Sequence, residues 1–257
     1  MSASSYDAIP DFGLLYDSVP LYGARKDIGF YVQEAAAARG PVLELGCGTG
    51  RILLPIARTG CGVVGLDDSR QMLARCREKL AAEPEQIRAR VTLHERDVRG
   101  FDLGAAFPLV IAPFRVFQQL TTVDDQLTFL GAVLRHLAPG GRFIFDVFNP
   151  NFIALTGHDG VEREDTPEQP LPDGRSFRRT ARVTQVRWLD QVSEIELSYY
   201  VAAQRFVQAF EMRWYLRTEL QHILARAGFR ISEMYGDFAR GPLVDGSPEQ
   251  VVCAERA

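Results

Sequence analysis

Three closely spaced glycines and two acids are the residues of this chain with the clearest chemical potential. Gly46, Gly48 and Gly50 stand between an apolar run that predicts a buried strand and a helical pattern, and Glu44 precedes them. Glycines in a strand-to-helix turn allow positive φ angles and let a ligand approach the backbone. The free N–H groups at the start of a helix favour negatively charged groups. Units of this kind bind nucleotides.

The second acid, Asp67, follows the next apolar strand, 21 residues after Gly46. At the tip of that strand its carboxylate would meet the two hydroxyls of a ribose, as in dinucleotide-binding folds. The glycine spacing is G-x-G-x-G, however, and not the G-x-G-x-x-G of the dinucleotide fingerprint. The pattern therefore predicts a nucleotide-like cofactor and disfavours a nicotinamide.

The run E-L-G-C-G-T-G at residues 44–50, with the acid after the next strand, resembles motif I of the class I S-adenosylmethionine-dependent methyltransferases. The resemblance covers roughly residues 40–148 and includes L-x-P-G-G before a strand at 142–148. It implies an α/β fold, a doubly wound, seven-stranded Rossmann-like sheet with the cofactor S-adenosyl-L-methionine across the carboxyl ends of the strands. The implied activity is methyl transfer (EC 2.1.1.-), with S-adenosyl-L-homocysteine as product.

The resemblance also implies which residues hold the cofactor. Asp97 matches the acid that hydrogen-bonds the adenine amino group, and the Val98 backbone would donate to a ring nitrogen. The expected cofactor residues are Glu44, Gly46, Cys47, Gly48, Gly50, Asp67, Asp68, Met72, Asp97, Val98 and Pro113. Ala-Pro-Phe-Arg follows the fourth strand in place of the N-P-P-Y type tetrapeptide of related nucleic-acid methyltransferases. A base-flipping enzyme is therefore disfavoured.

Composition narrows the partners further. The net charge of −4 argues against a protein that depends on nucleic-acid phosphates. The four cysteines form no C-x-x-C pair and no metal spacing, so we expect reduced thiols, no metal site and a cytoplasmic protein. The sequence begins without a signal-peptide pattern and contains no run of 18 apolar residues, so no membrane partner is expected. A monomer or a homodimer is compatible with these features.

The organisation along the chain suggests four parts. Residues 1–39 form an N-terminal lid with little helical pattern, followed by a helix at 28–38 that Asp27 caps. Residues 40–150 form the cofactor-binding core. Residues 151–215 form a β insertion, loop-like to 174 and then about three strands of a meander. Residues 216–257 return to the core sheet. In the resembling family such an insertion roofs the acceptor site.

The methyl acceptor is predicted to be a small molecule, methylated on N or O by in-line displacement. No histidine stands beside the motif-bearing strand ends, which favours an amine or an acidic hydroxyl over an acceptor that needs a strong base. No catalytic residue is singled out. Candidate substrate residues are Tyr16, Tyr22, Phe114, Arg115, Phe117, Gln118, Asn149, Arg213 and Tyr215. A nicotinamide-dependent oxidoreductase and a non-catalytic S-adenosylmethionine-binding protein remain alternatives.

Overall fold

Short apolar strands build the central sheet of the protein, whose computed structural model describes residues 5–257. The sheet has seven strands in the order β10-β11-β5-β4-β1-β2-β3, in which β11 runs antiparallel to both of its neighbours. The predicted fold class is confirmed. The strands are β1 (Val42–Leu45), β2 (Val63–Asp67), β3 (Val91–Glu95), β4 (Phe107–Ala112), β5 (Leu137–Phe148), β10 (Phe229–Tyr235) and β11 (Glu249–Arg256).

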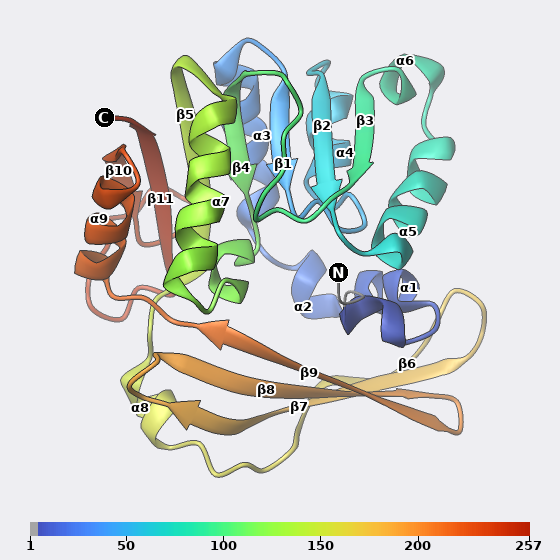
Figure 1. Cartoon of the computed structure of the whole chain (residues 1–257). Helices are drawn as coiled ribbons and strands as arrows, with labels where there is room; N and C mark the ends of the chain where they lie inside the picture. The colour runs from blue at the N-terminus through green and yellow to red at the C-terminus, as the bar shows by residue number, and fades with distance from the viewer. Residues whose placement is uncertain (1–4) are drawn as a thin grey trace.

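Helices cover both faces of this sheet, so each face has its own hydrophobic core (Figure 1). One core joins the strands to α7 and α9, and the other joins them to α3, α4 and α5. Parallel strands buried on both faces read as continuous apolar runs, as the sequence does here. The helices are α3 (Asp27–Ala38), α4 (Leu53–Arg58), α5 (Arg70–Ala81), α6 (Glu85–Arg88), α7 (Val123–His136) and α9 (Arg217–Arg226).

A second sheet of four antiparallel strands lies opposite the carboxyl ends of β1, β2 and β3 (Figure 1). We call it the roof sheet. It consists of β6 (Arg163–Pro170), β7 (Ser176–Arg187), β8 (Val192–Val201) and β9 (Gln204–Arg213), and α8 (Phe152–Thr156) precedes it. Four strands therefore replace the three expected, because β6 arises within the stretch predicted to be loop-like. Its proline-rich sequence, with register shifts against β7, explains why alternation did not reveal it.

Residues 5–23, the N-terminal segment, lie between the two sheets (Figure 1). They form η1 (Ser5–Ala8), α1 (Phe12–Asp17) and α2 (Pro20–Gly23), where little helix was expected. These turns are too short to show helical periodicity, and tertiary packing stabilises them. Phe12 and Leu15 are buried against the roof sheet residues Phe177 and Tyr199. Residues 1–4 of the predicted lid lie outside the described residues.

Asp27 does not cap the helix as predicted. It is the first residue of α3, and its fully buried carboxylate accepts hydrogen bonds from Arg25 Nε at 2.9 Å and from both terminal nitrogens of Arg51 at 2.7 Å. By contrast, Ser69 does cap α5, because its side-chain oxygen accepts from the Met72 backbone N–H. The pairing of Asp27 links the start of α3 to Arg51, the residue after the glycine loop, by charge.

Gly65, in β2, should tolerate no side chain. A Cβ atom there would lie 2.5 Å from Leu53 Cδ1 of α4 and 2.8 Å from Cys47 Sγ. We expect Gly65→Ala to lower the free energy of unfolding by about 1–3 kcal/mol through overpacking. Gly100→Ala is the matched control, since nothing lies within 4 Å of its Cβ position. Urea unfolding curves that give equal stabilities for the two variants would contradict this prediction.

Candidate functional site

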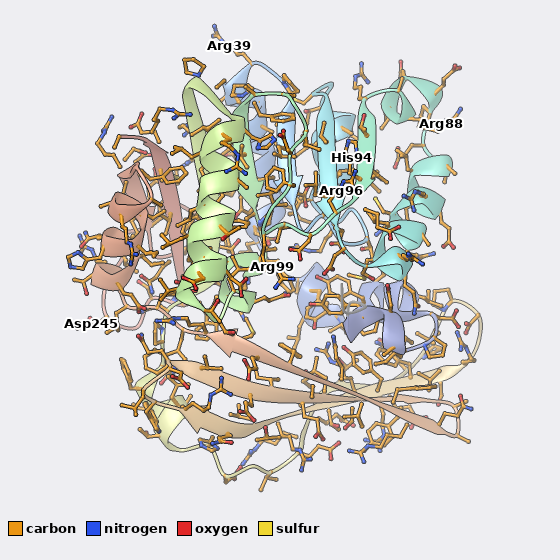
Figure 2. The ribbon with its side chains drawn as sticks, in the orientation of Figure 1. Arg39, Arg88, His94, Arg96, Arg99 and Asp245 are labelled. Carbon is orange, nitrogen blue, oxygen red and sulfur yellow. The ribbon has the colours of Figure 1, made fainter. Side chains whose placement is uncertain are left out.

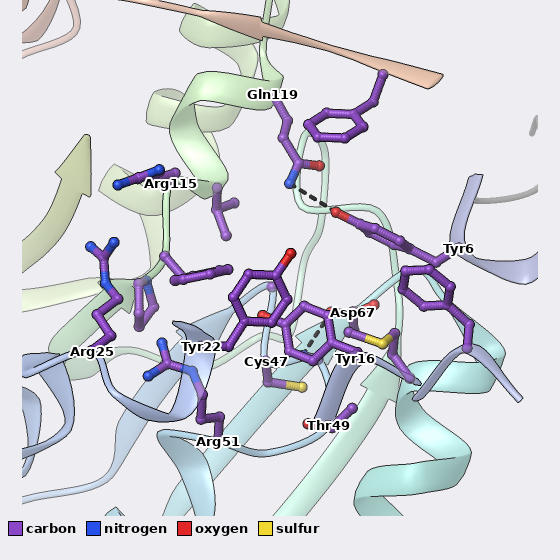
Figure 3. A pocket seen from close by; sticks show the side chains of 18 of the residues that line it. Tyr6, Tyr16, Tyr22, Arg25, Cys47, Thr49, Arg51, Asp67, Arg115 and Gln119 are labelled. Carbon is purple, nitrogen blue, oxygen red and sulfur yellow. Dashed lines mark hydrogen bonds between the residues drawn. The ribbon is translucent and has the colours of Figure 1, made fainter. Parts of the chain in front are cut away.

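The carboxyl ends of β1, β2 and β4 face a cavity of about 710 Å³. The N-terminal segment and the inner face of the roof sheet complete its walls (Figure 3). Ligands of open α/β sheets bind at this edge, because the loops that leave the strands converge there. The cofactor and substrate residues predicted from the sequence are therefore expected to line this cavity.

The loop after β1 brings its backbone to the cavity wall. Gly46 and Gly48 line the cavity with φ angles of 68° and 54°, a region that residues with a side chain rarely adopt. A Cβ atom on Gly46 would also lie 2.5 Å from Val116 Cγ2. Gly50 serves a different purpose: its Cβ position lies 2.7 Å from Cys76 Sγ, which lets α5 pack close to the loop. The structure thus places two of the three glycines at the cavity.

Asp67 ends β2 beside that loop. Its two carboxylate oxygens accept from the backbone N–H of Gly48 at 2.8 Å and of Ser69 at 2.9 Å, which fixes the side chain in one orientation. Burial raises the pKa of Asp67 to about 6, although the two N–H donors lower it in part. Each oxygen keeps a lone pair for another donor. Asp67 can therefore bind two hydroxyl groups when it is ionised.

Glu44 lies beneath the loop and lines the cavity while being almost fully buried. Its Oε2 atom has no hydrogen-bond partner within residues 5–257. Burial raises the pKa of Glu44 well above its usual range, with Arg51 opposing this shift. A buried carboxylate oxygen without a donor is costly, so a donor from a ligand would stabilise it. Cys47, Asp68, Met72, Val98 and Pro113 also line the cavity.

Asp97 does not line the cavity. Its carboxylate accepts from Arg99 Nε at 2.9 Å and 3.0 Å and from the Arg99 backbone N–H, and these bonds lower its pKa. Arg99 lies beyond the carboxyl end of β3, in the chain that leads to β4 (Figure 2). The role of Asp97 toward the adenine stays a prediction, and its neighbour Val98 lines the cavity.

Three aromatic rings project into the middle of the cavity. Tyr16 and Tyr22 come from the N-terminal segment, and Phe114 comes from the exit of β4. The ring centroids of Tyr22 lie 4.6 Å from Tyr16 and 5.0 Å from Phe114. Phe114 and Arg115 both have positive φ angles, 59° and 69°, which are strained for residues with a side chain. This backbone conformation directs both side chains toward the cavity, which they line.

Charged groups hold Phe114 in that conformation. The guanidinium carbons of Arg25 and Arg51 lie 5.1 Å and 4.9 Å from its ring centroid. Its backbone N–H donates to Asp146 Oδ1 at 2.9 Å, and Asp146 is fully buried. The same oxygen accepts from the Tyr31 hydroxyl at 2.7 Å. Phe114 is therefore fixed from both its ring and its backbone.

The roof contributes a polar group of its own. Arg179 of β7 is buried and donates to both oxygens of Asp165 at 3.0 Å and 2.9 Å. Its remaining nitrogen donates to the Tyr22 hydroxyl at 2.6 Å, which links the roof sheet to the N-terminal segment. Since the Tyr22 oxygen accepts a hydrogen bond from Arg179, the Tyr22 hydroxyl proton points away from Arg179.

Five predicted substrate residues do not line the cavity. Phe117 and Tyr215 are fully buried in the core, where the Tyr215 hydroxyl donates to backbone carbonyls at 3.2 Å and 3.3 Å. Gln118 donates to the Arg213 carbonyl and accepts from the Phe148 N–H, so it joins β5 to β9. Arg213 pairs with Glu219 at 2.6 Å. The remaining residue of this group is Asn149, beside β5. The short helix η2 (Val116–Gln119) directs Phe117 and Gln118 into the core, whereas Val116 and Gln119 line the cavity, and linear spacing did not reveal this.

Several cavity residues were not predicted from the sequence: Arg25, Arg51, Asp165, Arg179, Gln208 and Glu249. Two of these residues could have been recognised from their sequence context. Arg51 directly follows Gly50, and Arg179 interrupts an apolar face of β7 between Phe177 and Ala181. An arginine on a buried face needs a partner or a ligand, which marks it as a candidate. The others depend on contacts between distant segments.

Comparison with known proteins agrees with this geometry. Residues 43–143 match a family described as "Methyltransferase domain". The chain is 26% identical over 227 residues to dTDP-3-amino-3,4,6-trideoxy-alpha-D-glucopyranose N,N-dimethyltransferase of Streptomyces venezuelae, covering 86% of this chain and 89% of that protein.

Two solved structures are also similar. CalS10, an amino pentose methyltransferase from Micromonospora echinaspora with S-adenosylmethionine bound, is 26% identical with a TM-score of 0.67, covering 94% of this chain and 96% of CalS10. The CcbJ methyltransferase from Streptomyces caelestis has the same fold, with a TM-score of 0.79, 24% identity and 100% coverage of both chains. The chain belongs to the class I S-adenosylmethionine-dependent methyltransferases and is an enzyme that uses S-adenosylmethionine as its cofactor.

Proposed function

We propose that the protein transfers a methyl group to an amine nitrogen of a small molecule. The observation that carries this proposal is the lining of the cavity: among the described residues that line it, none is a histidine. The roof carboxylate Asp165 is held by Arg179, and Glu249 accepts from Arg25 and Arg115. A hydroxyl acceptor would need a base near its working pH, whereas an amine needs only to arrive neutral.

The residues at the glycine loop fit the cofactor. Asp67 would accept the two ribose hydroxyls, and the unpartnered Oε2 of Glu44 would accept from the α-ammonium group. Gly46 and Gly48 leave the backbone open to close approach. Val98 and Met72 would cover the adenine with apolar surface. A nicotinamide oxidoreductase, the alternative with the same acid after β2, is not supported by the family assignment.

When bound, S-adenosylmethionine supplies an electrophilic methyl group on a positively charged sulfur. The protein then has to hold the acceptor nitrogen in line with that methyl group and to exclude water. Proximity and orientation of this kind can provide about 7–11 kcal/mol of a reaction barrier. Tyr16, Tyr22 and Phe114 would position the acceptor with their rings, because these side chains are fixed by packing and by the arginines around them.

The roof sheet and the N-terminal segment favour a small acceptor. Inward-facing roof side chains such as Ile195, Leu197 and Met212 line the cavity opposite the glycine loop. A cavity covered by these two elements leaves little room for a nucleic-acid duplex. The similarity to an aminosugar N,N-dimethyltransferase and to an amino pentose methyltransferase also supports an amine on a small molecule. Within residues 5–257 no helix is long and apolar enough to cross a bilayer.

A panel assay tests the nitrogen assignment. The purified protein is incubated with S-adenosylmethionine and matched amines, alcohols and phenols, and methylated products are identified by mass spectrometry. We expect methylated amines and no methylated alcohols. For each accepted amine, turnover at low substrate should rise with pH until the amine is deprotonated, because only the neutral form attacks. Transfer to alcohols or phenols alone would contradict the proposal.

Asp67 provides a pH-dependent test of cofactor binding. Its carboxyl has a pKa of about 6 in the ligand-free protein, so it is ionised at pH 8 and mostly protonated at pH 5. Because the ionised form accepts the ribose hydroxyls, the affinity for S-adenosylhomocysteine should fall about tenfold from pH 8 to pH 5. Asp67→Asn should weaken binding at pH 8 by about 1–3 kcal/mol and flatten this pH dependence. Calorimetry that finds the same profile for both proteins would remove Asp67 from the ribose site.

A cavity-filling substitution tests the roof. Ile195 of β8 lines the cavity, so Ile195→Trp should occupy the acceptor space. We expect methyl transfer to fall by about tenfold or more while S-adenosylhomocysteine binds within about threefold of its normal affinity. The control is Val207→Trp, at a half-exposed position of β9 that does not line the cavity. Full turnover in the Ile195 variant would show that the roof does not contact the acceptor.

A further inference from the structure

Arg115 and Glu249 meet at one end of the cavity, which both residues line. Glu249 is the first residue of β11 and pairs with Phe148 of β5. Its Oε1 atom accepts from Arg25 Nη1 at 3.0 Å and from Arg115 Nη2 at 3.2 Å. Figure 3 shows Arg115 on the same side of the cavity as Arg25 and across from Asp67. This end therefore lies apart from the proposed ribose site.

Each member of this pair has a second polar atom without a partner. Glu249 Oε2 and Arg115 Nε are buried, and neither makes a hydrogen bond within residues 5–257. Leaving a buried polar atom unpaired costs stability, and native proteins rarely do so without a functional reason. Since both side chains line the cavity, a ligand that enters it can supply the missing partners with a small adjustment of either side chain.

The two atoms define the chemistry of that ligand group. Arg115 Nε can only donate a hydrogen bond, and an ionised Glu249 Oε2 can only accept one. The charges around them are already matched, because three guanidinium groups face three carboxylates in one contiguous cluster. These residues are Arg25, Arg51, Arg115, Asp27, Asp146 and Glu249.

An uncharged group that both donates and accepts satisfies all of these conditions, and a hydroxyl is the smallest one. An ammonium group could donate to Glu249 but would place an uncompensated positive charge beside Arg25 and Arg115. A carboxylate could accept from Arg115 but would face the Glu249 carboxylate. The Arg115 guanidinium is held in place for such a contact, since its central carbon lies 5.4 Å from the centroid of the Phe148 ring, which restricts its orientation.

We propose that Glu249 and Arg115 bind a hydroxyl group of the methyl acceptor, which makes the preferred acceptor a hydroxylated amine. The hydroxyl donates to Glu249 Oε2 and accepts from Arg115 Nε. This inference rests on the proposed function, because it assigns a second polar group to the same acceptor molecule. It makes Glu249 and Arg115 specificity-determining residues, whereas the ring cluster of Tyr16, Tyr22 and Phe114 positions the nitrogen.

Calorimetry with simple amines tests the hydroxyl site. The protein is loaded with S-adenosylhomocysteine and titrated with cyclohexylamine and with aminocyclohexanols whose hydroxyl is on the adjacent or the next ring carbon. We expect one aminocyclohexanol to bind about tenfold more tightly than cyclohexylamine, as befits hydrogen bonds to charged groups. Glu249→Gln should reduce this preference to about threefold or less, because its amide replaces an acceptor oxygen with a donor.

Two further variants complete the design. Glu255→Gln is the matched control: Glu255 lies in the same strand, β11, and pairs with Arg230 away from the cavity, so the preference should be unchanged. Arg115→Lys keeps the positive charge but removes the Nε donor, so the preference should be lost there as well. If Glu249→Gln does not fold, Arg115→Lys alone tests the hydroxyl site.

The outcomes separate this inference from the proposed function. Equal binding of all amines, no binding of any of them, or a full preference in both cavity variants would overturn the hydroxyl site. Methyl transfer to cyclohexylamine as efficient as to the aminocyclohexanols would also reject it while leaving amine methylation intact. Transfer to cyclohexanol in place of the amines would instead reject the proposed function.

Discussion

Buried carboxylates that must be paired hold the site of this enzyme together. Asp27 and Asp146 are fully buried, and their partners include Arg25 before α3, Arg51 after the glycine loop and the Phe114 N–H after β4. Removing one partner of a buried ion pair is strongly destabilising, because the remaining charge stays desolvated. The position of the glycine loop, the strained exit of β4 and the attachment of the N-terminal segment therefore depend on one another.

This dependence explains how a cavity with few reactive groups can favour catalysis. Methyl transfer from a sulfonium needs positioning more than acid–base chemistry, and positioning requires rigid side chains. Phe114 contacts two guanidinium groups, and Tyr22 is held by Arg179, whose own orientation is set by Asp165. The charged side chains thus mainly fix the walls of the cavity, and the aromatic rings form the surface that contacts a ligand.

Local signals allowed much of the fold to be predicted. The strand at Val42–Leu45 and the glycine turn are each encoded within a few neighbouring residues, and the structure has both. Residues whose role depends on distant partners were harder to place. Tyr215 looked like a cavity residue at the end of the roof but packs in the core, whereas Glu249 had no local signal at all and lies at the cavity. β6 was missed because its proline-rich sequence becomes a strand only through pairing with β7.

The N-terminal segment has a consequence for how the chain folds. Phe12 packs against Tyr199 with ring centroids 5.4 Å apart, and Tyr22 accepts its hydrogen bond from Arg179. Contacts between such distant parts of a chain slow folding, because the intervening loop must close before they form. A ribosome makes the N-terminal segment first, yet its partners in β7 and β8 emerge after the strands β1 to β5. The glycine loop can thus form from neighbouring segments early, while its aromatic cover stays exposed until the roof sheet has been synthesised.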